Sequence, residues 1–283
     1  MTTTQHTLTQ TSIQQYIDSL KSKERSTSTI SQYTHALQLL LCCAANRPLD
    51  KPLLIAWKNQ LMQHYAPTTV NALLAAVNGY LKHHQRRDLL IQPLKIQRPH
   101  FSDEHKELTR TEYQRLVQTA EHTSQHRLAL ILQTIAATGI RVSELRFITA
   151  DAVRSGRAHV HNKGKHRLVL LPTKLCTLLK CYLRQQKKSA GPVFTTRTGR
   201  PIDRSNIWRA MKALCRQARV APEKVFPHNL RHLFARTFYA AEKDLLRLAD
   251  LLGHTSINTT RIYTLESGAQ YLRQLDRMHM VIT

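Results

Sequence analysis

Apolar side chains recur every three or four residues through most of residues 12–90, which is the spacing of amphipathic helices. In residues 29–45 the apolar stripe is formed by Ile30, Tyr33, Leu37, Leu40 and Leu41. In residues 70–81 it is formed by Leu73, Leu74, Val77 and Leu81. Because such stripes need partners that bury them, this part of the chain is predicted to form a small helical bundle.

The helical period is lost over residues 92–100, where Pro93 and Pro99 stand among polar and basic side chains. Proline disfavours the helical conformation of the residue before it, so this stretch is expected to be extended. We therefore predict a helical domain over residues 1–95, a basic linker over 96–103, and a second domain over 104–283 that ends in a C-terminal tail.

The second domain is predicted to be mainly helical with one small β-hairpin. Helical spacing covers residues 112–119 and 127–138. Residues 158–162 and 166–170 favour strands on either side of a lysine-glycine-lysine turn, which is typical of a hairpin. After this hairpin the helical period returns up to about Met280. The fold class is therefore mainly α with a small β-sheet, in two domains.

The charge of the chain narrows the class of partner. The 283 residues include 42 Lys and Arg against 18 Asp and Glu, a formal net charge of +24. Residues 1–100 contribute +7 and the remainder +17, so both predicted domains are basic. A positive field spread over a folded body fits nucleic acid, whereas membrane binding usually concentrates charge on one amphipathic helix. An ordinary enzyme of small neutral metabolites is disfavoured.

The sequence shows no sign of export or of a membrane partner. The first residues lack a basic segment followed by an apolar core, and the apolar run 37–45 is shorter than the roughly 20 residues that span a bilayer. The five cysteines form no C-x-x-C pair and have no metal-ligand spacing. We therefore expect a cytoplasmic protein with buried free thiols.

Two patterns in the second domain place cations near a helix start. Arg141 follows the break at Gly139, and a guanidinium there can donate two hydrogen bonds to a phosphate. Alone, an Arg three residues before Glu144 is more often part of a surface ion pair. His228 and Arg231 are one helical turn apart and can address one anion, but alone such a pair is more often a packed His beside an exposed Arg.

Two further patterns supply groups for proton transfer and attack. Gly253 allows a sharp turn that would direct His254 outward, and Tyr263 follows nine residues after this His. A phenol can attack phosphorus when its proton is accepted and the developing oxyanion is stabilised. Alone, such a Tyr is more often a packing residue. Lys163 or Lys165 in the hairpin turn either protonates a leaving oxygen or only contacts a backbone phosphate.

Together, the ordered set Arg, Lys, His-x-x-Arg, Leu-Gly-His and Tyr resembles the tyrosine recombinases, the phage integrase family. The resemblance covers the whole second domain, and the helical first domain is similar to the core-binding domain of that family. Residues 242–264 are particularly similar to transposon-encoded tyrosine resolvases and Xer-like recombinases. The resemblance implies a two-domain clamp around DNA, with residues 1–95 binding DNA and residues 104–283 carrying catalysis.

The resemblance also implies a role for each residue at the reacting phosphate. Tyr263 would be the nucleophile that forms a 3′-phosphotyrosyl bond and releases a 5′-hydroxyl. Arg141 and Arg231 would hold the non-bridging oxygens, where fixed guanidiniums stabilise the developing charge. Glu144 would support the reaction by orienting Arg141.

The remaining roles concern protons. The resemblance makes Lys163 the general acid for the leaving 5′-oxygen, although a register error of one residue would exchange it with Lys165. His228 would accept the proton of the phenol, and His254 would donate a hydrogen bond to the phosphate. No metal or other cofactor is expected, because the sequence has no carboxylate cluster of metal-ligand character and no Walker motif for ATP.

The resemblance implies specific recombination sites in double-stranded DNA and a homo-tetramer that exchanges strands through a Holliday junction. We expect a mobile-element enzyme for cointegrate resolution or for integration and excision. The C-terminal residues 270–280 carry an apolar stripe at helical spacing, formed by Tyr271, Leu272, Leu275 and Met278. This stripe would pack either on a neighbouring protomer or on its own domain.

Two other functions use the same scaffold. A catalytically idle regulator would bind specific DNA sequences without cutting them. A type IB topoisomerase-like enzyme would relax any supercoiled plasmid as a monomer, whereas a recombinase needs two defined sites. The target sequence and the biological outcome are left open by the sequence.

Overall fold

The computed structural model describes residues 7–96, 106–162, 165–263 and 276–278. The chain divides into two compact units, Met1–Arg98 and Pro99–Thr283. In its described part the protein is mainly helical with one two-stranded antiparallel sheet, which confirms the predicted fold class. The predicted linker 96–103 lies outside the described residues except for its first position. Among the described residues, no helix is both long enough and apolar enough to span a bilayer.

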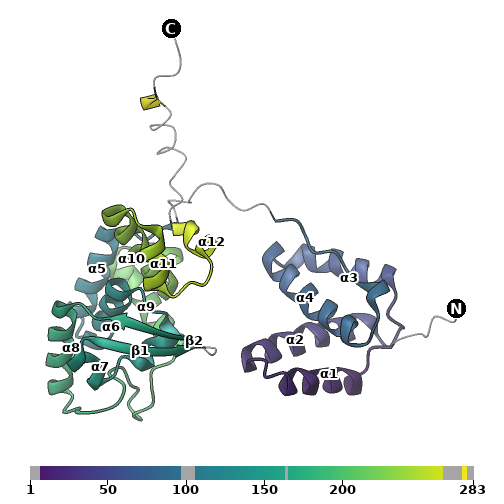
Figure 1. Ribbon diagram of the computed structural model, residues 1–283, viewed down its shortest axis with the longest axis horizontal. Coiled ribbons are helices and arrows are strands. Elements are labelled where there is room, and N and C mark those ends of the chain that lie inside the picture. Colours follow the sequence, from purple (N-terminus) through teal and green to yellow (C-terminus); the bar gives the residue numbers. More distant parts are fainter. Residues whose placement is uncertain (1–6, 97–105, 163–164, 264–275, 279–283) are drawn as a thin grey trace, which may run out of the picture. The chain divides into compact units, whose positions relative to one another are not determined.

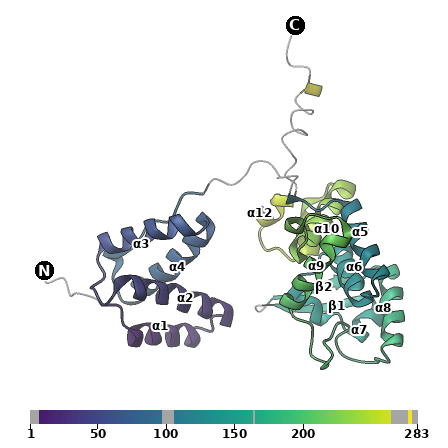
Figure 2. The ribbon, with the colours of Figure 1, turned by 180° about the vertical axis from the view of Figure 1, so that it is seen from behind.

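The described part of the first unit is a helical bundle of α1 (Gln10–Ser22), α2 (Thr27–Ala44), α3 (Lys51–His64) and α4 (Pro67–His83), followed by the short 3-10 turn η1 (Arg87–Leu89). Helices α1 and α2 form one layer, and α3 and α4 form the other (Figures 1 and 2). Thr9, Ser26 and Asp50 cap the first three helices by accepting a hydrogen bond from the backbone N–H three residues on. These caps fix where the helices begin.

The core of this unit is built by the apolar stripes of α2 and α4. Leu37 and Leu40 of α2 and Val77 of α4 are fully buried. Tyr80 packs edge-on against Tyr16 with ring centroids 5.6 Å apart, and its hydroxyl forms a 2.8 Å hydrogen bond with Ser12 Oγ. The buried polar end of this tyrosine is therefore satisfied.

Two asparagines of α4 hold the extended segment that leaves this bundle. Asn78 donates to the carbonyl of Ile91 at 2.8 Å and accepts from its backbone N–H at 2.9 Å. Asn71 makes the same pair of bonds with Leu94, at 2.9 and 2.7 Å. Each side-chain amide thus replaces a neighbouring strand, which satisfies backbone groups that have no sheet partner.

The described elements of the second unit are α5 (Arg110–His122), α6 (His126–Thr138), η3 (Val142–Phe147), α7 (Ala150–Ser155), β1 (Arg157–Asn162), β2 (Lys165–Leu170), α8 (Thr173–Gln185), α9 (Arg204–Ala218), η4 (Pro222–Lys224), α10 (Pro227–Glu242), α11 (Leu245–Leu252), α12 (Ile257–Thr260) and η5 (Arg261–Tyr263). Helix α6 is apolar on most sides and packs against α5, α8, α9 and α10. Helix α11 packs on α10 (Figure 1). The central position of α6 explains its nearly continuous apolar sequence.

The hairpin prediction is confirmed. Strands β1 and β2 pair antiparallel from Arg157 opposite Leu170 to Asn162 opposite Lys165. The turn residues Lys163 and Gly164 lie outside the described residues. Alternation along β2 sends Val169 into the core and leaves Leu168 and Leu170 exposed.

The predicted helix start at Arg141 is confirmed, but one other expectation differs from the structure. The segment after Arg141 is a 3-10 helix, because its backbone N–H groups bond three residues back, as Glu144 does to Arg141 at 2.8 Å. The thiols are free, but only Cys176 and Cys215 are buried. Cys43 is half-buried, and the expectation was wrong for the exposed Cys42 and Cys181. Both exposed thiols lie on outward faces of their helices.

We predict that Asn78→Ala destabilises the first unit by about 1–3 kcal/mol, because it leaves the backbone N–H and C=O of Ile91 without partners. Urea unfolding of the full chain would be followed by fluorescence in a Trp208→Phe background, so that Trp57, buried in this unit, reports alone. Asn59→Ala on the exposed side of α3 is the control. Equal midpoints for the two variants would contradict the prediction.

Candidate active site

Helix ends of the second unit meet at one place and bring the predicted residues together. Helix α6 ends at Gly139, two residues before Arg141. The φ of Gly139 is 63°, in the left-handed region that glycine adopts without steric strain. Helix α10 begins with a proline, and Arg231 lies in its second turn. Helix α11 ends at Gly253, with a φ of 64°, directly before His254. Each glycine thus stops a helix where a polar side chain follows.

Arg231 is the centre of this arrangement and is 1% exposed. Its Nη1 donates to the carbonyl of Gly139, and its Nη2 donates to the carbonyl of Leu252 at 2.7 Å. The last carbonyls of a helix have no partner within the helix and carry the negative end of its dipole, so a cation is a natural hydrogen-bond donor to them. Arg231 therefore ties α10 to the ends of α6 and α11.

His254 is held between Arg231 and Thr260. Its Nε2 lies 2.9 Å from Arg231 Nη2, and its Nδ1 lies 2.9 Å from Thr260 Oγ1. Because a guanidinium only donates, Nε2 is the acceptor, and the single proton of the neutral ring is on Nδ1. Thr260 is fully buried, so both ring nitrogens are fixed.

Tyr263 lies in the same cluster and is 3% exposed. Its ring packs edge-on against His232, with centroids 4.7 Å apart, and is stacked at 6.0 Å from His254. His232 in turn contacts His228 at 4.7 Å between centroids. The phenol therefore lies against the imidazoles of His232 and His254 and influences the pKa of the Arg231 guanidinium.

Arg141 is fixed by Glu144, which is 1% exposed. Glu144 accepts from the Arg141 backbone N–H at 3.1 Å and from its Nη1 at 3.0 Å. The same carboxylate accepts from Arg167 Nη2 on β2 at 2.6 Å. Although burial acts in the opposite direction, the hydrogen bonds and charges of Arg167 and Arg141 hold the pKa of Glu144 below its ordinary value.

The histidines of the cluster are neutral at pH 7. Burial, followed by the charges of Arg231, Arg141 and Arg167, lowers the pKa of His254 to about 4. Burial, followed by His228 and Arg231, lowers the pKa of His232 to about 4.

The same effects act on His228 and on the Arg231 guanidinium. Loss of hydration, then the charges of Arg231, Arg141 and Arg204, lowers the pKa of His228. Burial and then Arg141 lower the pKa of Arg231 to about 10. The charge of Arg141 thus reaches His228, Arg231 and His254, which places these groups at one site.

The structure brings five of the predicted residues into this site, namely Arg141, His228, Arg231, His254 and Tyr263, and Glu144 contacts the first of them. Lys163 lies outside the described residues, and the side chain of Lys165 is not described, so the choice between them stays a prediction. Most of the predicted C-terminal stripe, including Tyr271 and Leu275, also lies outside the described residues.

Sequence reasoning missed two residues of the site. His232 lies four residues after His228, a spacing that places both on one helical face, and this spacing was its only signal. Arg167 occupies an inward-facing position of β2. It lies opposite the buried Val160 of β1 and two residues before the buried Val169 on the same strand. A cation at a position that alternation assigns to the core signals a buried ion pair.

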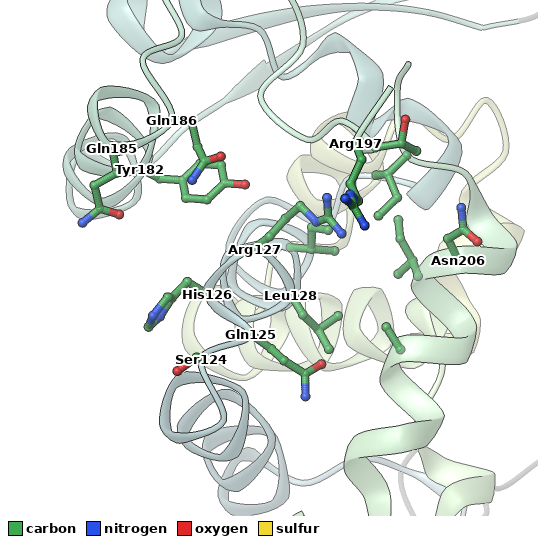
Figure 3. Close-up of a pocket in the computed structure, with 15 residues that line it drawn as sticks. Ser124, Gln125, His126, Arg127, Leu128, Tyr182, Gln185, Gln186, Arg197 and Asn206 are labelled. Atoms are coloured by element: carbon green, nitrogen blue, oxygen red, sulfur yellow. The ribbon is translucent and has the colours of Figure 1, made fainter. Parts of the chain in front are cut away.

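The described residues contain no group of three or more His, Cys, Asp and Glu side chains placed to hold one metal ion. A separate cavity of about 550 Å³ lies elsewhere in the second unit, between the start of α6, the end of α8 and α9. Figure 3 shows Arg127 and Arg197 extending toward one another there. Its lining includes none of the predicted site residues.

Comparison with known proteins links this site to one family. The model of the phage integrase family matches residues 106–269. The chain is 30% identical over 239 residues to tyrosine recombinase XerD of Pseudomonas putida, covering 80% of this chain and 79% of that protein. It is 25% identical over 277 residues to tyrosine recombinase XerA of Pyrococcus furiosus, covering 95% and 94%. With XerD of Xanthomonas campestris the alignment is 35% identical but spans only about half of that relative, 50%.

Solved structures share the fold. A lambda integrase dimer bound to a COC′ core site has a TM-score of 0.77 at 17% identity, covering 93% of this chain and 96% of that chain. XerH recombinase bound to its difH substrate has a TM-score of 0.66 at 21% identity, covering 83% and 76%. At 17% and 21% identity, these likenesses show a shared fold and nothing further.

We predict that the second unit loses stability as the pH falls from about 6.5 toward 4. His232 and His254 have ordinary pKa values of 6.5 when unfolded and about 4 when folded, so in this window the unfolded state binds more protons. His232→Gln should weaken this pH dependence. Urea midpoints between pH 7.5 and 4.5 measure it, with exposed His122→Gln as control. Parallel curves for the unaltered chain and the His232 variant would contradict the prediction.

Proposed function

This chain belongs to the phage integrase family, and from that premise we propose that it is a tyrosine recombinase that breaks and rejoins DNA at specific sites. The observation that carries the proposal is the contact of Arg231 with His254 at 2.9 Å, with the Tyr263 ring stacked on the same His. A phenol, a guanidinium and an imidazole from three separate segments thus meet at one point. Their meeting suits nucleophilic attack on a phosphodiester.

In the proposed reaction the Tyr263 oxygen attacks phosphorus, and the bond from phosphorus to the 5′-oxygen breaks. A neutral phenol is a weak nucleophile and needs a base. His228 suits that role, because its lowered pKa keeps it neutral and able to accept the phenol proton at pH 7. Lys163 is proposed to protonate the leaving 5′-oxygen. Rejoining is the reverse, with the 5′-hydroxyl attacking the phosphotyrosine.

Arg141 and Arg231 are proposed to bind the non-bridging oxygens of the phosphate. The Arg141 side chain is 36% exposed and keeps donors available beyond its bond to Glu144. Arg231 already donates from both Nη atoms, while its buried Nε has no acceptor among the described residues. Phosphate binding therefore has to compete with the carbonyls and His254 for this guanidinium.

His254 is proposed to donate to the phosphate, and this requires a change of its proton. In the unbound protein Nε2 accepts from Arg231 and Nδ1 bonds Thr260. A bound phosphate would draw Arg231 away and raise the pKa of His254, so that Nε2 could carry a proton and donate. The unbound site is thus arranged around Arg231, and the substrate completes it.

The two units suit a division of labour. We assign DNA binding to the helical domain 1–95 and catalysis to residues 104–283, joined by the linker 96–103. Both are basic, as phosphate contacts along a duplex require. A lambda integrase tetramer bound to a Holliday junction has a TM-score of 0.75 to this chain, and it supports a homo-tetramer that exchanges strands through such a junction. We place the enzyme in a mobile element, acting in cointegrate resolution or in integration and excision.

We predict that the chain forms a covalent adduct with nicked duplexes and that Tyr263→Phe abolishes the adduct while leaving DNA binding intact, because only the attacking oxygen is lost. Duplexes would first be selected from a random library by binding to the full chain and then nicked near their centre to trap the intermediate. Tyr239→Phe on α10 is the control and should form the adduct.

The same substrates separate the alternatives. A catalytically idle regulator would bind the selected duplexes without forming an adduct. A type IB topoisomerase would relax plasmids that lack any selected site. Either result would contradict the proposed recombinase.

A further inference from the structure

Arg167 connects three segments of the second unit. It lies on β2, and its side chain is 13% exposed. Nη2 donates to Glu144 at 2.6 Å and Nη1 donates to the carbonyl of Leu251, near the end of α11, at 2.7 Å. One guanidinium thus joins the hairpin strand, the η3 segment and the end of α11.

The bond to Glu144 determines how that carboxylate holds Arg141. Glu144 Oε2 accepts from both Arg167 Nη2 and the Arg141 backbone N–H, while Oε1 accepts from Arg141 Nη1. A carboxylate that is 1% exposed needs close cationic partners to remain charged. Without Arg167, Glu144 would either bind a proton or turn both oxygens toward Arg141.

Through its bond to Leu251 of α11, Arg167 also contacts the segment that leads to His254. At Gly253 an added Cβ would collide with Cδ of Arg167, and the φ of 64° is also unfavourable for other residues. The glycine of the Leu-Gly-His motif therefore does more than turn the chain. It leaves space for the Arg167 side chain to pass directly beneath the residue that precedes His254.

We propose that Arg167 is a positioning residue that holds Arg141, through Glu144, in register with the His254 segment and with the hairpin that carries the proposed general acid. This inference rests on the proposed recombinase function. Arg167 itself contacts no reacting atom in this scheme. Its effect is geometric, since a displacement of about 1 Å at a catalytic group can lower a rate roughly 100-fold.

Arg236 on α10 offers a matched control. Like Arg167 it is partly buried, pairs with a glutamate, Glu107, and donates to a backbone carbonyl, that of Leu108, at 2.8 Å. Both have a buried Nε without an acceptor among the described residues. Its partners lie before α5 rather than at the site, so Arg236→Gln reports the effect of losing a buried guanidinium alone.

The test measures single-turnover formation of the covalent adduct on a nicked duplex. Arg167→Gln should slow cleavage by about 100-fold with DNA affinity changed less than threefold, whereas Arg236→Gln should change cleavage little at matched stability. Arg167→Lys keeps the charge but cannot fork to both acceptors, so its rate should lie between the two.

A pH profile and a double variant separate positioning from a general structural role. In Arg167→Gln the pKa of Glu144, still facing Arg141, should rise, so the fall of the rate on the acid side should move to higher pH. If Arg167 acts through Glu144, Glu144→Gln combined with Arg167→Gln should be no slower than the slower single variant. The double variant also removes the buried carboxylate that has lost the cationic partner Arg167 and could unfold Arg167→Gln.

Three results would each overturn the inference. The first is an equal loss of cleavage rate in Arg167→Gln and Arg236→Gln, and the second is an acid side of the pH–rate profile that does not move in Arg167→Gln. The third is a double variant whose loss of rate is the product of the two single losses. Absence of adduct with the unaltered chain is a different result. It would contradict the proposed recombinase function itself, so the two failures are distinguishable.

Discussion

The burial of the Arg231 charge is the constraint on which the rest of the site depends. A guanidinium that is 1% exposed needs acceptors that are themselves free, and the last carbonyls of helices are such groups. The end of α6 supplies Gly139, and the end of α11 supplies Leu252. Both helices must therefore end beside α10, which brings Arg141 and His254 within reach of the same guanidinium.

Glycine makes this convergence possible. A Cβ at Gly139 would collide with the ring of Phe234 and with Leu252, and a Cβ at Gly253 would collide with Arg167. The two positions also need a positive φ. The motif glycines are thus explained by two requirements at once: a left-handed helix end and the close approach of α10, α11 and the hairpin strand.

The sequence was sufficient for most of the elements and for the five predicted residues that the structure brings together, because periodicity and motif order are local properties. The hairpin and the helices around Arg141, Arg231 and His254 follow from them. It was insufficient for the burial of Arg231 and Tyr263, since i and i+3 spacing fixes a shared face but not what covers it. Arg167 was missed for the same reason: its partners Glu144 and Leu251 lie 23 and 84 positions away.

The electrostatics of the site explain why it suits an anion. Arg141 and Arg167 share the carboxylate of Glu144, whereas Arg231 donates to the carbonyls of Gly139 and Leu252 and to the neutral imidazole of His254. The excess positive charge lowers the pKa values of His228 and His254, following the effect of burial. The negative charge of a phosphate entering this cluster would offset part of that field. The same charges that keep the imidazoles neutral in the unbound protein would then favour the substrate, which is how a preorganised site stabilises a developing oxyanion.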